Sequence, residues 1–408
     1  MLIDDAALSI SCCTWNVGGI DAPGLDVIRR WIDKGSDLIF VGLCEMIELS
    51  AIRVVRESVV PMSHERAARL QAWRHVLRSH LSEYELMCED GLCGLALFVF
   101  SLRDQELASR ALTATHRLGF GGLPNKGAVA ARLEFERGAT LCVVHSHFAA
   151  DQDQCHARNA NYRHLTNETW VFGAETTEVR LKPKHEFCTC GDFLCGESMP
   201  TGPVEARLLD HSLLIWMGDL NYRLDDVERG GSNYNPLVGG VTPASPEYRG
   251  LDAELEAALE SKDYQHVVDS CCQLKRAMKQ GDAFEGFREA PIRFPPTYKL
   301  IKNTPRLTYT KSRRPAWCDR VLWRTRNDYL YRGNAQLVTP PPRYLASLLG
   351  TNYDDACDDD DDDDAAALIS FADHAPAIDA PVYAAVPTTL SDHLPVKCLL
   401  RWHDFWDN

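Results

Sequence analysis

Short apolar runs separated by polar segments dominate the chain, and their lengths are typical of buried β-strands. Eight such runs occupy residues 8–17, 37–43, 94–100, 128–135, 141–148, 213–218, 318–323 and 394–402. Between them, residues 61–80 and 252–278 repeat apolar side chains at the spacing of one helix face. Strands and helices that alternate along a chain predict an α/β protein.

Three segments lack either pattern and are interpreted as insertions. Residues 172–207 are polar with a cysteine cluster, residues 230–249 are rich in Gly, Pro, Ser and Asn, and residues 335–387 contain a proline triplet and an aspartate run. We expect residues 354–380 to be disordered, because like charges repel one another and little of this segment can be buried. The motifs described below span all three insertions, so we predict a single domain over residues 1–408.

Charge and composition narrow the classes of function. The net charge is −15, to which Asp354, Asp355 and the run 358–364 contribute nine negative charges. A polyanionic ligand therefore requires a focused basic pocket, and nucleic acid is not expected as a partner. No apolar run reaches the roughly 18–20 residues that span a bilayer, and the acidic start of the chain is unlike a secretory signal. We expect a cytoplasmic protein whose fifteen cysteines are mostly small buried hydrophobes.

Polar side chains cluster where the predicted strands end. The clusters are residues 14–19, 43–46, 145–148 and 216–223, and residues 390–395 precede the last strand. Strand ends that meet at one edge commonly carry the sites of α/β folds. Each cluster alone is a weak signal, since a Gly-Asp at a strand end is more often a turn and a single Glu is usually a solvated cap. Together, their oxygen ligands and imidazoles indicate metal-assisted hydrolysis.

Two longer motifs carry a family resemblance. Residues 216–223 (Trp-Met-Gly-Asp-Leu-Asn-Tyr-Arg) and 315–323 (Pro-Ala-Trp-Cys-Asp-Arg-Val-Leu-Trp) resemble the two signature motifs of the inositol polyphosphate 5-phosphatases, a family of the endonuclease/exonuclease/phosphatase superfamily. Further matches keep the family order at residues 14–19, 125–127, 146–150, 158–159, 281–299 and 391–393. The resemblance implies a four-layer sandwich of two mixed β-sheets with helices on the outer faces. It also implies Mg²⁺-dependent hydrolysis of the 5-phosphate monoester of phosphoinositides, such as phosphatidylinositol 4,5-bisphosphate, or of soluble inositol polyphosphates.

The resemblance also assigns a metal site. Glu45 is similar to the principal Mg²⁺ ligand of the family, Asn16 would lie close to the metal and the phosphate, and Asp392 would lie near the metal. The residue types agree with this assignment, because Mg²⁺ prefers hard oxygen ligands and binds through only one or two carboxylates while keeping several waters.

Five residues resemble the family's catalytic set. Asp219 occupies the position that orients and deprotonates the attacking water, and Asn221, two residues along the same strand end, is expected to point the same way and bind phosphate. His393 resembles the histidine that stabilises the scissile phosphate, Asp319 would orient it, and His147 would be a second phosphate contact. The reaction implied is in-line attack of water on phosphorus.

Substrate recognition is implied by basic residues near the second motif. In the family, such residues grip the ring phosphate at position 4, and here they are Tyr298, Lys299, Lys311 and Arg313. Asn125 and Lys126 would add to the same pocket. Taken alone, the basic run at residues 311–314 is more typical of a solvated surface, but its position beside the signature motif favours a binding role.

The chain departs from the family pattern at three positions. Cys44 replaces a Gln before the metal-binding Glu, Asn161 replaces an Asp, and Phe148 replaces a Leu. None of these positions carries a ligand named above, so activity is expected to survive. Loss of the Gln could weaken the orientation of Glu45.

Two other clusters are open to interpretation. The insertion at residues 172–207 contains four candidate zinc ligands, His185, Cys188, Cys190 and Cys195. Its Cys-x-Cys spacing fits a zinc site poorly, and ordinary loop cysteines are favoured. The aspartate run 358–364 lacks the spaced ligands and the Gly of a calcium loop, so a solvated acidic loop is favoured.

Two alternative functions remain. One is another phosphodiesterase of the same superfamily, which would share Asn16, Glu45 and Asp219 but would not need Tyr298 and Lys299. The other is a non-catalytic phosphoinositide-binding scaffold. Such a protein would be expected to have other residues at the catalytic positions but to keep the basic pocket. The sequence leaves open whether the substrate is lipid-borne or soluble, and contact with a membrane would be peripheral.

Overall fold

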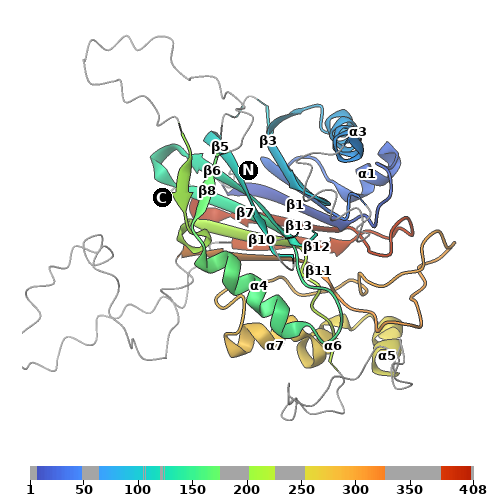
Figure 1. The fold of residues 1–408 in the computed structure, drawn as a ribbon. Helices are drawn as coiled ribbons and strands as arrows, with labels where there is room; N and C mark the ends of the chain where they lie inside the picture. The colour runs from blue at the N-terminus through green and yellow to red at the C-terminus, as the bar shows by residue number, and fades with distance from the viewer. Residues whose placement is uncertain are drawn as a thin grey trace, which may run out of the picture.

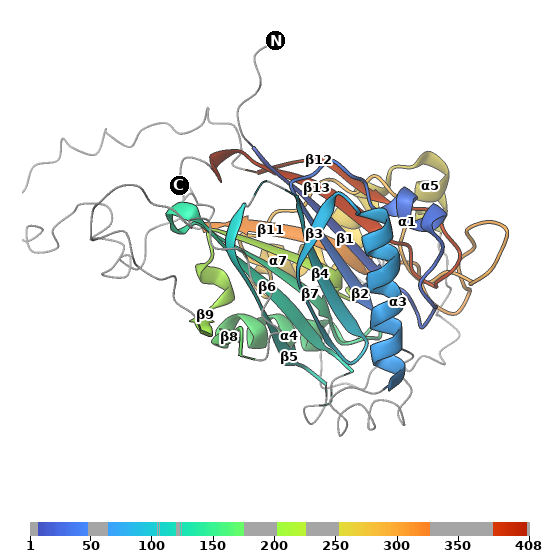
Figure 2. The same ribbon diagram turned by 90° about the horizontal axis from the view of Figure 1, so that it is seen from above.

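The protein is described here by a computed structural model that covers residues 7–47, 64–103, 107–119, 125–174, 202–225, 253–326 and 378–405, with the single residues 105 and 123. Two large sheets form its centre (Figures 1 and 2). The first has six strands in the order β12 (Ile378–Ala385), β13 (Val396–Trp402), β1 (Leu8–Asn16), β2 (Leu38–Cys44), β4 (Leu95–Leu102) and β3 (Tyr84–Leu92). The second has five strands in the order β11 (Asp319–Thr325), β10 (Leu213–Asp219), β7 (Thr140–His147), β6 (Gly127–Phe135) and β5 (Ala108–Arg117). Both sheets are mixed, because β1 runs parallel to β2 and β10 runs parallel to β7 while the other neighbours are antiparallel.

The inner strands β1, β2 and β4 of the first sheet are buried on both faces. In β1, Ile10 and Cys12 face the second sheet, whereas Trp15 faces the helices α1 (Leu25–Trp31) and α3 (His64–His80). The ring of Trp15 meets Trp31 at 5.5 Å and Trp73 at 6.1 Å, both edge to face. Burial on both faces explains why the sequence shows continuous apolar runs here instead of strict alternation.

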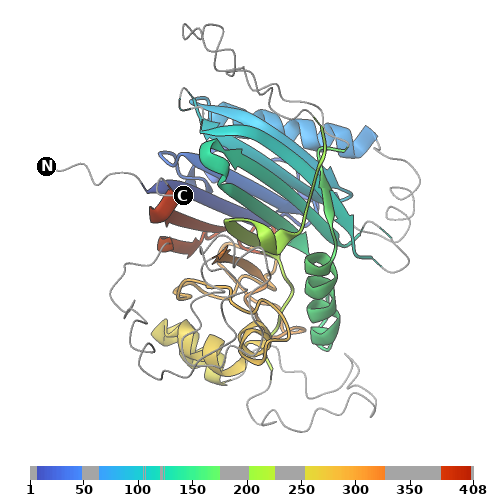
Figure 3. The ribbon, with the colours of Figure 1, turned by 90° about the vertical axis from the view of Figure 1, so that its left-hand side faces the viewer.

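Helices also cover the outer face of the second sheet (Figure 3). Tyr162 of α4 (Cys155–Asn167) packs 5.4 Å from the ring of Trp216 on β10. The same side of the molecule carries α5 (Ala253–Ser261), α6 (Tyr264–Cys271) and α7 (Gln273–Gln280). The smaller elements are a two-stranded sheet of β8 (Trp170–Phe172) and β9 (Val204–Ala206) and the 3₁₀ turns η2 (Glu136–Gly138), η3 (Leu208–Asp210) and η7 (His403–Phe405). The predicted four-layer α/β sandwich is confirmed.

All eight predicted strands are present with boundaries shifted by one or two residues. The periodic tract at 252–278 is not one helix. Lys262, with a φ of +62°, lies between α5 and α6, and Cys272 leaves helical geometry between α6 and α7, where it pairs in a bridge with Leu224. The expected insertion at 335–387 ends earlier than predicted, because residues 378–385 pair with β13 as strand β12. Residues 378–380, expected to be disordered, belong to this strand.

Most of the predicted insertions lie outside the described residues. These include residues 230–249, the rest of the segment 354–380 with its aspartate run, and the cluster of His185, Cys188, Cys190 and Cys195. Among the described helices, none is long and apolar enough to cross a membrane.

Candidate active site

The strand ends of the two sheets bring the predicted polar residues together. Asn16 ends β1, and Glu45 follows β2, the parallel neighbour of β1. In the second sheet, Asp219 pairs in register with His147 on one side and with Asp319 on the other. Directly opposed residues point to the same face of a sheet. The sheet register therefore sets three of these side chains in one row at the edge of the molecule's core.

Asp219 is the centre of the cluster. Its Oδ2 accepts a hydrogen bond from Nδ2 of Asn16 at 2.9 Å and lies 3.3 Å from Nε2 of His147. Nε2 of His393 lies 3.8 Å from the same oxygen. The side chain of Asp219 is almost completely buried. One carboxylate oxygen is thus shared by groups from three separate strand ends.

His393 is held between two carboxylates. Its Nδ1 donates to Oδ2 of Asp319 at 2.8 Å, while Nε2 faces Asp219. The ring of Tyr298 packs against the imidazole at 4.5 Å, and the indole N–H of Trp15 donates to the backbone carbonyl of His393 at 3.0 Å. Ring, backbone and Nδ1 are all fixed, so Nε2 is the atom left to meet a substrate.

The charged groups of this cluster oppose the effect of burial on the pKa values of His393 and Asp219. Burial alone would lower the pKa of His393, but Asp319 and Asp219 raise it to about 9. Burial would likewise raise the pKa of Asp219, yet the charge of His393, the contact with His147 and the charge of Lys126 hold it well below its usual range. Burial dominates at Asp319 and raises the pKa of its carboxyl. Near neutral pH the structure therefore favours a protonated His393 beside an ionised Asp219.

Glu45 lies next to this cluster in an unusual backbone conformation. Its φ angle is +52°, a region that non-glycine residues rarely adopt and that is often found at functional sites. Oε1 accepts from Nδ2 of Asn16 at 3.2 Å and lies 3.7 Å from Nε2 of His147. Its side chain is 32% exposed, so the carboxylate can be reached from solvent.

These donors fit a divalent cation. Asp219, Asp319 and His393 lie within 4.8 Å of one another and, among the described residues, are the group whose atoms are spaced for a metal ion. A histidine that holds protons on both nitrogens is a poor metal ligand, however. The carboxylate of Glu45 offers the hard oxygens that Mg²⁺ or Ca²⁺ prefers, with room for water. Asn16 turns its Nδ2 toward this carboxylate, while its Oδ1 accepts from the backbone N–H of Gly18 at 3.1 Å.

Asn221 does not lie on the strand as predicted. Strand β10 ends at Asp219, and Asn221 has a φ of +57°, so the argument from alternation along a strand fails. Its backbone N–H donates to Oδ1 of Asp219 at 3.1 Å, its Nδ2 donates to the carbonyl of Phe148, and its Oδ1 accepts from Arg223 at 2.5 Å. Asn221 therefore contacts Asp219 through its backbone.

The loop before β6 places its two predicted residues differently. Nζ of Lys126 donates to Nε2 of His147 at 2.5 Å, so this amine reaches the cluster. Burial lowers its pKa, although Asp219 and Glu45 oppose that shift. The buried Oδ1 of Asn125 instead lies beside Gly119, where an added Cβ would come within 2.2 Å of it.

Asp392 faces two lysines. Its carboxylate oxygens lie 3.8 Å from Nζ of Lys299 and 3.7 Å from Nζ of Lys302. The amine of Lys302 also donates to the carbonyl of Gly18 at 2.8 Å. Gly18, with a φ of +54°, has no room for a side chain, since a Cβ would lie 2.6 Å from that amine. The two lysines thus gather at the rim of the cluster.

The remaining substrate residues are spread along this rim. Tyr298 stacks on His393, Arg313 pairs with Asp151 at 3.1 Å, and Lys311 is exposed. Arg223 was not among the predicted site residues, but its guanidinium lies 4.3 Å from the centre of the Tyr298 ring and also binds Asn221. Its place at the end of the first signature motif was the available signal. Lys302 was also missed, although it follows Lys299 by only three residues.

The three departures from the family pattern have local partners. Sγ of Cys44 lies 3.4 Å from Nε2 of His145 in the core between the sheets. Asn161 accepts from the backbone N–H of Ala149 at 3.0 Å, and Phe148 packs in a cluster of aromatic rings. None of the three replaces a residue of the polar cluster.

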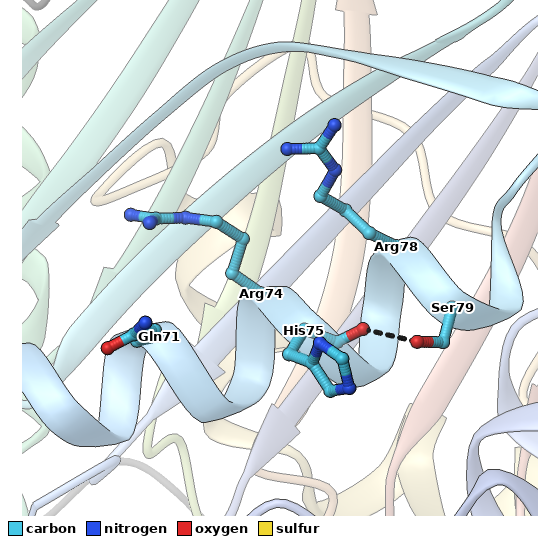
Figure 4. A pocket seen from close by; sticks show the side chains of 5 residues that line it. All are labelled: Gln71, Arg74, His75, Arg78 and Ser79. Atoms are coloured by element: carbon cyan, nitrogen blue, oxygen red, sulfur yellow. Dashed lines mark hydrogen bonds between the residues drawn. The ribbon is translucent and has the colours of Figure 1, made fainter.

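A second surface feature lies away from this cluster. An open hollow of about 400 Å³ on the outer face of α3 is lined by Gln71, Arg74, His75, Arg78 and Ser79 (Figure 4). Arg74 is already paired with Glu89 through Nε at 2.6 Å. The hollow contains no residue of the strand-end cluster, which is the better candidate site.

The fold and this cluster define the class of protein. The family model of the Endonuclease/Exonuclease/phosphatase family 2 matches residues 13–399, nearly the whole chain. The chain belongs to this family. The resemblance to inositol polyphosphate 5-phosphatases that the motifs indicated is confirmed by its relatives.

Two curated relatives illustrate this. Type II inositol polyphosphate 5-phosphatase 15 of Arabidopsis thaliana is 29% identical over 338 residues, which cover 79% of this chain and 28% of that protein. Synaptojanin-1 of Rattus norvegicus is also 29% identical, over 77% of this chain and 18% of that protein. The chain thus spans less than a third of the length of these relatives.

The fold has a solved counterpart. The inositol polyphosphate 5-phosphatase domain of SPsynaptojanin, solved in complex with inositol (1,4)-bisphosphate and a calcium ion, superposes with a TM-score of 0.60 at 20% identity. The match covers 97% of this chain and 84% of that domain. At this identity the likeness establishes the fold alone.

Proposed function

We propose that this chain removes the 5-phosphate from phosphoinositides, such as phosphatidylinositol 4,5-bisphosphate, or from soluble inositol polyphosphates, in a Mg²⁺-dependent reaction. The observation that carries this proposal is the clamping of His393 between Asp319 and Asp219. The family membership and the inositol polyphosphate 5-phosphatases among its relatives support it. The inositol bisphosphate and the calcium ion held by the SPsynaptojanin domain agree with the substrate class and with a divalent ion.

The residues have complementary roles in such a reaction. Glu45, with Asn16, would hold Mg²⁺, which supplies positive charge to a phosphoryl oxygen when bound. Asp219, kept ionised by its neighbours, accepts a proton from the attacking water. His393, protonated near neutral pH, donates from Nε2 to a phosphoryl oxygen as charge develops there.

Basic groups around the cluster account for a phosphorylated substrate. Lys126 touches His147, and Lys299 lies at the rim next to Asp392. Both side chains can make charge-assisted hydrogen bonds to ring phosphates. A chain of net charge −15 attracts a polyanion only through such a local group of cations.

A phosphate-release panel tests the proposal. Purified protein is incubated with phosphatidylinositol 4,5-bisphosphate in vesicles, with a soluble inositol polyphosphate and with a phosphodiester, each with Mg²⁺ or with a chelator. Hydrolysis of the first two is followed by the inorganic phosphate released, and cleavage of the phosphodiester by the alcohol released. We expect release from the inositol compounds only with Mg²⁺, and a fall of about 10²–10⁴-fold in Asp219→Asn. Asp26→Asn, an exposed aspartate of α1, is the matched control.

Two outcomes would overturn the proposal. Cleavage of the phosphodiester alone would assign the chain to a different hydrolase class of the superfamily. Binding of the inositol compounds with no phosphate released at any Mg²⁺ concentration would make it a scaffold.

A further inference from the structure

A basic hairpin lies beside the candidate active site. Residues 299–314, here called the basic hairpin, contain six Lys or Arg and no Asp or Glu, although the whole chain carries a net charge of −15. Its arms are joined by the backbone N–H of Ile301 donating to Thr308 at 2.8 Å and that of Thr310 donating to Lys299 at 3.0 Å. The segment projects from the body of the molecule as a loop (Figures 1 and 2).

The hairpin is fixed to the loop that carries His393. The backbone N–H of Leu300 donates to the carbonyl of Asp392 at 2.9 Å, and that of Asn303 donates to Thr389 at 2.6 Å. The side chain of Leu300 is buried beneath the hairpin. These contacts hold the hairpin in a defined orientation relative to the catalytic cluster.

The outer side of the hairpin is both basic and apolar. Ile301 is 42% exposed, and among the described residues only Val171 is a comparably exposed large apolar side chain. Arg306 and Lys311 are exposed and, within the described part of the chain, have no carboxylate at salt-bridge distance. Lys302 is also largely exposed, although it approaches Asp392.

The hairpin is close enough to the cluster to act on the same surface. The ring of Tyr298 lies 4.5 Å from His393, and Ile301 follows Tyr298 by three residues. Three extended residues span about 10 Å. A planar surface that touches Ile301 therefore presents its own polar groups close to the opening of the active site.

We propose that the basic hairpin docks on an anionic lipid bilayer, with Ile301 at the headgroup level and Arg306 against lipid phosphates. Charge complementarity selects an anionic surface, and the exposed apolar side chain between lysines favours lipid over an acidic protein. This docking deepens the proposed function, since it would make the lipid-borne form the preferred substrate. The docking of the hairpin on the bilayer is non-covalent and does not depend on phosphate hydrolysis.

Vesicle sedimentation tests the docking separately from catalysis. The probes are vesicles of phosphatidylcholine alone and vesicles that also contain phosphatidylserine, which carries no inositol phosphate to cleave. The variant is Ile301→Asn with Arg306→Glu. The matched control is Val171→Asn with Arg78→Glu, which makes the same changes on β8 and on the outer face of α3. Thermal unfolding checks that both variants are folded.

We expect the wild type to bind phosphatidylserine vesicles and the control variant to bind equally well. The hairpin variant should bind at least about tenfold more weakly, because each basic residue near an anionic leaflet strengthens binding about fivefold. Phosphate release from a soluble substrate should stay unchanged in this variant while release from vesicles falls.

Two results would overturn the docking proposal. The wild type could fail to bind phosphatidylserine vesicles, in which case its binding to poly-glutamate would indicate an acidic protein partner. Alternatively, the hairpin variant could bind the vesicles as tightly as the wild type. If instead no substrate releases phosphate while vesicle binding follows the expected pattern, the proposed function fails and the docking proposal stands.

Discussion

Nδ1 of His393 lies 2.8 Å from Oδ2 of Asp319, although 74 residues separate them along the chain. Both side chains are buried, and Oδ1 of Asp319 has no hydrogen-bond partner among the described residues. Oδ2 of this carboxylate therefore binds the imidazole directly. It fixes the ring and holds the proton on Nδ1, so that Nε2 faces the site.

We predict that Asp319→Asn lowers phosphate release far more than it weakens substrate binding. The amide keeps the size of the side chain but removes the charge that raises the pKa of His393 to about 9. By analogy with other carboxylate–histidine pairs, kcat should fall about 10²–10⁴-fold while KM changes little. Steady-state kinetics on a soluble substrate measure this, with the exposed Asp210→Asn as control. An unchanged kcat would remove Asp319 from the mechanism.

Cys44 gives a prediction about metal dependence. The Gln expected at this position could have oriented Glu45, but Sγ of Cys44 points to His145 and to the carbonyl of Ser146 in the core between the sheets. We predict that Cys44→Gln leaves the Mg²⁺ activation midpoint unchanged and destabilises the fold by about 1–3 kcal/mol, because the larger side chain overpacks this core. Mg²⁺ titrations of activity and urea unfolding measure the two effects. A shifted midpoint would assign position 44 to metal binding.

A buried ion pair supports the second signature motif. Arg320 donates to both oxygens of Glu289, at 2.6 and 2.5 Å, and Tyr383 of β12 donates to the same carboxylate at 3.0 Å. Burial would raise the pKa of Glu289, but Arg320 and Lys275 hold it below its usual range. This pair ties the motif to the edge strand of the other sheet.

We predict that Arg320→Met destabilises the protein by about 3–5 kcal/mol, because it takes the bidentate partner from the buried carboxylate of Glu289 and leaves it only Lys275 and Tyr383. The double variant Arg320→Met with Glu289→Leu should recover most of that loss, since both charges are then removed. Urea unfolding of the single and double variants gives the coupling. Equal stability of wild type and Arg320→Met would contradict the assignment.

Stability should also depend on pH through a buried histidine. Burial lowers the pKa of His211 to about 4 in the folded protein, from 6.5 for an exposed imidazole. Below pH 6.5 the unfolded chain therefore binds a proton that the folded chain does not, and stability falls as the pH drops toward 4. Between pH 7 and pH 5 we expect His211 to account for about 2 kcal/mol.

His211→Asn isolates this contribution. Nδ1 of His211 donates to the carbonyl of Leu208 at 3.0 Å, and an Asn can supply a similar donor without titrating. Urea unfolding at pH 7 and pH 5 should therefore show a smaller pH dependence in the variant than in the wild type. If the variant and the wild type show the same pH dependence of stability, a group other than His211 binds the proton on unfolding.

The local pattern of apolar and polar residues was enough to predict most strands of the two large sheets and the polar clusters at the strand ends. All eight apolar runs contain strands. In β1, β2, β4, β7, β10 and β11 nearly every side chain is buried, and burial on both faces favours continuous apolar side chains. The two signature motifs carry Asp219 and Asp319 in fixed places relative to Trp216 and Trp317, so the sequence located them without any knowledge of the sheet order.

Local pattern failed where a partner distant in the chain decides the conformation. Cys272 interrupts a helical period because it bridges to Leu224, and residues 378–385 become a strand because β13 offers them a free edge. Asn221 turns away from the strand because Arg223 and the carbonyl of Phe148 bind its side chain. None of these partners can be found from the residues near each position.

By itself, the sequence determined which residues have the chemistry for phosphate hydrolysis and which strand ends carry them. Only the tertiary structure decided that Asp219 pairs in register with both His147 and Asp319, and that His393 fits between two carboxylates. Sheet order and register depend on contacts between segments that are far apart in the chain. Local propensity contains no information about those contacts, and the site is built from them.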